Sequence, residues 1–114
     1  MSEDEYCLHV NAREGSLLWM VLADRAQSED EREWVQYIPV FTKLIECWSS
    51  MGFVRLFRGT EFPVDISGEE VPAEKVSELL GDASSWAYVE EPQPAICVVL
   101  GDRDLVELKD GMCD

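Results

Sequence analysis

WVQYIPVFTKLIECWSSMGFVRLFRG, residues 34–59, is the segment in which this chain concentrates its apolar side chains. From Trp34 to Met51 the apolar residues recur at steps of three and four, as on the buried face of an amphipathic helix. Gly52 is typical of a helix end in the left-handed conformation, and FVRLF at 53–57 has the composition of a strand. We therefore predict a central helix, a glycine stop and a buried strand, with the rest of the chain built around them.

Pro39 interrupts the helical pattern, because proline has no N–H and its ring clashes with the carbonyl of Val35. Two alternatives stay open. One is a single helix that kinks at Pro39. The other is a helix that ends near Tyr37 and a second that begins near Pro39, where proline is favoured in the first turn. The start is predicted at Ser28, since Glu31 follows three residues later with the spacing of a capping box.

The flanking segments predict the other elements of the fold. The apolar run 17–23 predicts a buried helix capped by Ser16, because leucine and methionine favour helix. Residues 5–10 leave open a short strand or the first turn of a helix. Downstream, we predict an edge strand at 61–66 and a helix opened by Pro72 at 72–81. A buried strand at 95–100 and a returning hairpin strand at 104–108 follow.

The length of 114 residues and the hydrophobic content of 46% fit one domain with a real core. We predict an α+β fold over 1–114, with about three helices packed on a small, mainly antiparallel sheet and frayed ends at about 1–4 and 109–114. No apolar run approaches the ~20 residues of a membrane span. The N-terminus is acidic where an export signal would be basic, so we expect a cytoplasmic protein.

The four cysteines, at positions 7, 47, 97 and 113, form no CxxC pair. Disulfide frameworks belong mainly to small secreted chains without a sufficient core. We therefore expect four reduced thiols, with Cys47 and Cys97 buried as small apolar residues.

The charge is strongly acidic, with 24 acids against nine bases and a net charge of −15. Residues 34–60 are the exception, with one acid and three bases. Direct binding of nucleic acid is disfavoured, because phosphate contacts need clustered lysine and arginine. A basic protein partner is favoured by comparison, although solubility alone would also explain an acidic surface.

The order of segments resembles that of small winged-helix-like bacterial proteins. The resemblance rests on five segments that together cover about 16–108. They are an apolar helix, a capped helix ending at Gly52, and the stretches FVRLFRG, VPAEKVSELLGD and AICVVLGD. Some such orphan proteins are encoded beside toxins and resemble immunity proteins. The resemblance implies a winged-helix-like scaffold. It departs from DNA-binding winged helices because no predicted helix carries a basic face.

The residues that could support catalysis are few. His9 is the sole histidine, and on a strand its side chain would share a side with Cys7. Thiolate–imidazole pairs usually converge from different elements, however, and not from neighbouring positions. No cysteine or histidine pair has the spacing of a structural zinc site. We predict no enzyme activity, no metal and no cofactor.

We predict a non-enzymatic inhibitor, similar to immunity proteins or antitoxins, that blocks a basic, nucleic-acid-handling partner with its acidic surface. The alternatives are a dimerising winged-helix-like adaptor without direct DNA binding, and a small-ligand domain near Trp34 and Tyr37. If 72–81 is helical, the acids spaced four apart share one face. Tryptophans could anchor an interface, with a homodimer as a corollary. The predicted partner-binding acids are Glu29, Asp30, Glu31, Glu33, Glu69, Glu70, Glu74 and Glu78, and the candidate interface aromatics are Trp19, Trp34 and Trp86.

Overall fold

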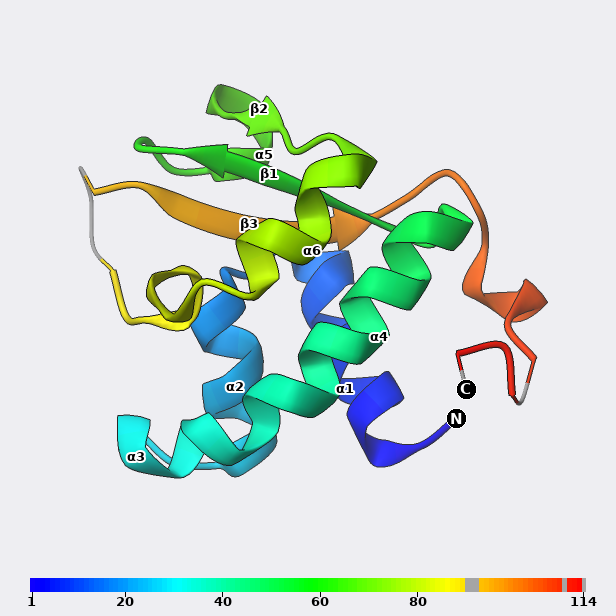
Figure 1. Ribbon diagram of the computed structural model, residues 1–114, viewed down its shortest axis with the longest axis horizontal. Coiled ribbons are helices and arrows are strands. Elements are labelled where there is room, and N and C mark those ends of the chain that lie inside the picture. The colour runs from blue at the N-terminus through cyan, green and yellow to red at the C-terminus, as the bar shows by residue number, and fades with distance from the viewer. Residues whose placement is uncertain (90–92, 110, 114) are drawn as a thin grey trace.

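Helices packed against a three-stranded antiparallel sheet make up this α+β structure, as a computed structural model shows for residues 1–89, 93–109 and 111–113 (Figure 1). The predicted α+β class is confirmed. The sheet has the order β2–β1–β3. The helices are α1 (Glu3–Glu14), α2 (Leu18–Ala26), α3 (Glu31–Trp34), α4 (Ile38–Met51), α5 (Val64–Ser67) and α6 (Val76–Leu80), and the strands are β1 (Val54–Gly59), β2 (Glu69–Glu70) and β3 (Ala95–Leu100).

The segment between the first two helices pairs with the sheet. Leu17, between α1 and α2, forms an isolated antiparallel bridge with Cys97 of β3. Next to it, the Val98 N–H donates to the Ser16 carbonyl at 2.9 Å. The order along the chain is therefore α1, the bridge, α2, α3, α4 and then the strands β1 and β3. In the sequence, α5, β2 and α6 lie between these two strands.

The alternative of two helices around Pro39 is the correct one. A short 3-10 turn, Val35–Tyr37, separates α3 from α4, and Pro39 lies in the first turn of α4. An N–H at Pro39 would have no intrahelical partner there, so proline is tolerated. Gly52 ends α4 with a φ of 86°, as its position predicts.

The predicted capping box at Ser28 is wrong, because the helix begins two residues later. Asp30 is the N-cap of α3 and accepts from the Arg32 N–H at 2.9 Å. Ser28 Oγ instead accepts from the Asp30 N–H at 3.0 Å, in the turn before the helix. The Ser28 carbonyl is also engaged, since Trp34 Nε1 donates to it at 2.8 Å.

The N-terminus differs from the expected frayed tail. Ser2 caps α1, and its backbone N–H donates to Glu5 Oε1 at 2.8 Å in a true capping box. Residues 5–10, which left strand and helix open, belong to this helix. Because neighbours two positions apart on a helix point about 200° apart, Cys7 and His9 do not share a side as they would on a strand.

Three short segments differ from their predicted structure. The predicted edge strand 61–66 is wrong: α5 forms there because Val64 turns inward and is buried. The predicted hairpin strand 104–108 is a 3-10 turn capped by Asp104, which accepts from the Val106 N–H at 2.9 Å. Ser16 does not cap α2, which begins after Leu17 without a side-chain cap.

The core confirms the central role of residues 34–59. Phe41, Ile45 and Trp48 of α4 have no exposed surface, and neither does Phe53 at the entry to β1. They pack against Leu8 of α1 and against buried residues of α2, α6 and β3. The groove and the C-terminal segment described below are therefore attached to a rigid apolar centre.

Candidate protein-docking surface

The eight predicted acids fall at two separate places. Glu29, Asp30, Glu31 and Glu33 surround α3, and the other four follow the segment from β2 to α6. Figure 1 shows α3 and β2 at opposite ends of the molecule. The structure therefore offers two candidate acidic surfaces and does not join them into one.

The acids around α3 are partly explained by the start of that helix. Asp30 caps it and also pairs with Arg32, whose Nη2 lies 2.9 Å from Asp30 Oδ2. The Arg32 side chain and backbone N–H lower the pKa of Asp30. Glu31 Oε1 accepts from the Tyr88 N–H at 3.4 Å. The hollow beside α3, about 270 Å³, is mainly apolar, and Glu31 is the one acid among the described residues of its lining.

The acids of the β2–α6 segment line a groove of about 440 Å³. We call it the acidic groove. Glu69 and Glu70 come from β2 and Glu78 from α6, so three predicted residues converge on it. Asp82, just after α6, is a fourth carboxylate that sequence reasoning missed. In the sequence, Asp82 is distinguished only by following Gly81 at the predicted end of a helix, and this position does not indicate a groove. The remaining lining residues are Arg58, Val71, Pro72, Lys75 and Leu79.

The carboxylates of the acidic groove are not equally available. Arg55 binds both carboxylate oxygens of Glu70, at 3.1 and 2.5 Å, and lowers the pKa of Glu70. This pair ties β2 to β1. Asp82 Oδ1 accepts from the Ser84 N–H and Oγ–H, and these bonds, with a smaller contribution from Arg58, lower the pKa of Asp82. Both acids stay ionised and serve the local structure.

Glu69, Glu74 and Glu78 are the freer acids. All three are exposed. Glu78 pairs with Lys75 at 3.8 Å, a weak exposed contact. In the part of the chain that the structure describes, no basic group lies within ion-pair distance of Glu69 or Glu74. Their charges are open to a partner.

The expected row of acids on one helix face is wrong. Glu70 lies in β2, Glu74 in the 3-10 turn Ala73–Lys75 and Glu78 in α6. A spacing of four brings side chains together only within a continuous helix, and here the backbone changes type twice. Glu74 consequently lies outside the lining of the groove.

Two of the three candidate interface tryptophans are core residues. Trp34 and Trp86 are 5% and 2% exposed, and Trp86 Nε1 donates to the Leu80 carbonyl at 2.9 Å. Trp19 is half-buried and stacks on Trp34 with ring centroids 5.7 Å apart, while the Tyr88 ring meets Trp19 edge-on at 4.8 Å. Only Trp19 retains appreciable surface for a partner.

The expectation of four reduced thiols is wrong, because Cys47 and Cys113 form a disulfide. Cys7 and Cys97 are free and buried, and burial raises their pKa values to about 12 and about 11. Within residues 1–89, 93–109 and 111–113, no three His, Cys, Asp or Glu side chains gather as a metal site. None of the described helices has the length and apolar character needed to cross a bilayer.

Comparison of the chain with protein-family models, with curated proteins and with solved structures gives no match.

Proposed function

We propose that this protein is an inhibitor-type binding protein that docks its acidic groove against a basic protein and blocks it. A surface adapted to nucleic acid carries clustered lysine and arginine. The groove carboxylates would take the place of phosphates on that surface. Opposite charges would also speed the encounter and make its rate depend on salt.

The observation that carries the proposal is the convergence of carboxylates in one concave place. Glu69, Glu70, Glu78 and Asp82 come from β2, α6 and the turn after α6, and they outnumber the two bases of the lining. Simple solubility needs charges anywhere on the surface and does not require them to meet in a groove. Around α3, by contrast, Asp30 caps the helix and Glu31 borders an apolar hollow.

The test compares two variants with the same change in charge. Glu69→Gln/Glu74→Gln/Glu78→Gln alters two acids of the groove and Glu74 in the neighbouring 3-10 turn, and Glu29→Gln/Glu31→Gln/Glu33→Gln alters the opposite end. Each takes the net charge from −15 to −12. Glu70 and Asp82 are left intact because they hold Arg55 and Ser84. Circular dichroism checks that both variants keep the fold.

The measurement is capture of basic proteins from the native host's lysate on the immobilised chain, quantified by mass spectrometry at low and high salt. We expect the groove variant to lose about tenfold or more of a specific basic partner at low salt, through lost charge complementarity. The matched variant should stay within about twofold of the unaltered chain. Equal loss in both variants would indicate attraction by net charge alone, and undiminished capture by the groove variant would exclude this surface.

A further inference from the structure

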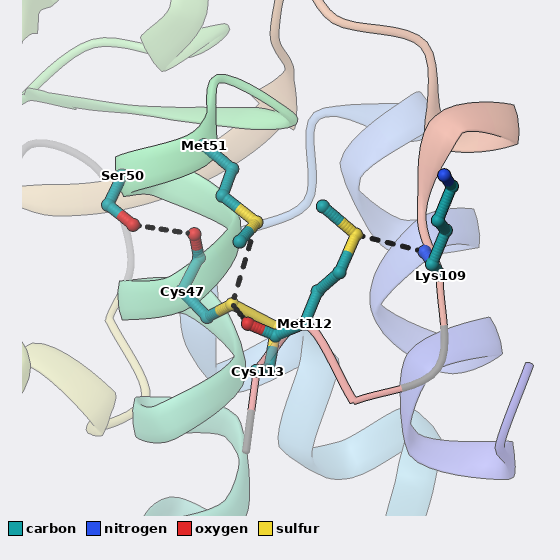
Figure 2. The surroundings of a disulfide bond; sticks show 6 residues. All are labelled: Cys47, Ser50, Met51, Lys109, Met112 and Cys113. Atoms are coloured by element: carbon teal, nitrogen blue, oxygen red, sulfur yellow. Dashed lines mark hydrogen bonds between the residues drawn. A yellow bond between two sulfur atoms is a disulfide. The ribbon is translucent and has the colours of Figure 1, made fainter.

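The C-terminal strap, residues 109 and 111–113, runs up to α4 and is joined to it by the Cys47–Cys113 disulfide (Figure 2). The two cysteines are 66 positions apart in the sequence. Cys47 Sγ also lies 3.9 Å from Met51 Sδ and 3.7 Å from the Met112 carbonyl oxygen. Because a disulfide sulfur carries no proton, both are non-bonded contacts. The bond is thus the direct link from the strap to the helix.

Little else holds the strap by directed interactions. The hydrogen bonds of its described residues stay inside it: the Met112 N–H donates to the Lys109 carbonyl at 3.3 Å, and the Lys109 N–H contacts Met112 Sδ at 3.0 Å. Met112 and Cys113 are partly buried against the core. These two apolar contacts oppose the conformational entropy that the segment would regain if it detached.

The strap forms one wall of a pocket of about 260 Å³. Val40, Lys43 and Leu44 of α4 form another wall, and Ser2, Asp4 and Glu5 at the start of α1 close the site. Removing the strap would open this pocket and uncover the strip of α4 that contains Val40, Leu44 and Cys47. Access to the strip therefore depends on the strap.

The centre of the core lies on the inner face of α4, away from the disulfide. Phe41, Ile45 and Trp48, on the inner face of α4, are fully buried. Disulfides act as structural staples mainly in small domains that lack such a core, whereas those of reducing compartments are mostly transient and redox-sensing. A bond between a helix surface and the end of the chain, over a complete core, fits the second use.

We propose that the Cys47–Cys113 disulfide is a redox latch: oxidised, it holds the strap over α4, and reduced, it releases the strap and opens the pocket. This inference is independent of the proposed function, because α4 and the strap do not line the acidic groove.

The reaction is thiol–disulfide exchange with a dithiol reductant. A thiolate of the reductant attacks Cys113 Sγ, the Cys47–Cys113 bond breaks, and Cys47 leaves as a thiolate that takes up a proton. The mixed disulfide joins the first sulfur of the reductant to Cys113 Sγ. The second thiolate of the reductant attacks that first sulfur and releases Cys113 as a thiolate, which is also protonated. The protein gains two electrons and two protons, and the dithiol becomes a disulfide.

The other two thiols, Cys7 and Cys97, are poorly placed to take part in this exchange. Cys7 and Cys97 are buried at 8% and 1% exposure. Burial raises the pKa of both thiols, so the thiolate that would take part in exchange is scarce at neutral pH. Reduction and oxidation should consequently be confined to Cys47 and Cys113.

The test is hydrogen–deuterium exchange of the full chain, air-oxidised and then reduced with dithiothreitol. On reduction we expect the strap amides to exchange at least tenfold faster, with unchanged protection in β1 and β3. N-ethylmaleimide should label Cys47 and Cys113 in the reduced protein and leave Cys7 and Cys97 unlabelled. The Cys113→Ser variant should match the reduced protein with or without dithiothreitol.

Three results would overturn the latch. Unchanged strap exchange on reduction would show that packing holds the strap without the bond. Loss of protection throughout β1 and β3 would make the bond a structural staple. Intact mass showing no disulfide in the air-oxidised chain would remove the switch itself.

Discussion

Gly101 is a residue whose role lies in backbone contact and not in a side chain. It follows β3, and its N–H donates to the Phe53 carbonyl at 2.8 Å, while the Arg103 N–H donates to the Gly52 carbonyl at 3.0 Å. A Cβ on Gly101 would overlap the Gly52 carbonyl oxygen. The turn after β3 therefore lies directly against the end of α4. From the sequence, Gly101 reads only as a turn residue.

Gly101→Ala should destabilise the fold by about 1–3 kcal/mol, because the added methyl must displace backbone. Gly81→Ala is the matched control: Gly81 has an ordinary φ of −76°, and the nearest atom to an added Cβ is 3.4 Å away. Its free energy of unfolding should change by less than about 1 kcal/mol. Urea unfolding measures both. Equal effects from the two substitutions would contradict the close approach at Gly101.

Ser28 and Asp30 show why element boundaries are hard to assign from sequence. Both residue types are favoured N-caps, and Ser28 alone has Glu31 at the capping-box spacing. The structure uses Asp30, because Trp34 then lies where its ring is buried and its Nε1 reaches the Ser28 carbonyl. Tertiary burial decides between two caps that local preference leaves almost equal.

Asp30→Ala should therefore cost about 1 kcal/mol of stability, the usual loss for an N-cap. The Arg32 pair adds little, since both side chains are exposed. Ser28→Ala should cost less, since Ser28 Oγ accepts a hydrogen bond only in the preceding turn. Thermal unfolding of both variants measures the difference. If Ser28→Ala proved the more damaging change, the helix would begin where the capping box predicts.

Elements with a strong apolar pattern could be predicted, whereas the largely polar helix α1 and the short elements could not. α4, β1 and β3 carry strong apolar patterns, so their type and order follow from the sequence. α5 and the 3-10 turn Leu105–Glu107 hold too few residues to show a period, and one inward side chain in each, Val64 or Leu105, determines the path. The groove acids were partly predictable as an acidic segment, but not as a groove.

At the scale of the whole molecule, the net charge follows from the sequence, but the arrangement of the charged side chains in space does not. The net charge of −15 says nothing about which acids meet. Arg55 and Glu70 come together through the β1–β2 pairing, and Asp82, just after α6, meets the acids of β2 only in the folded chain. The Cys47–Cys113 bond likewise joins positions 66 apart, which no local pattern pairs.

The central claim is that a basic partner sits in the acidic groove, and carbodiimide crosslinking of the complex tests it most directly. The reagent joins a carboxylate to a lysine amine only where the two touch, so mass spectrometry of the crosslinked peptides maps the contact on the unaltered chain. We predict crosslinks concentrated at Glu69 and Glu78, the freer acids of the groove lining. Crosslinks concentrated at Glu29, Glu31 and Glu33, or spread evenly over the acids of the chain, would contradict the claim.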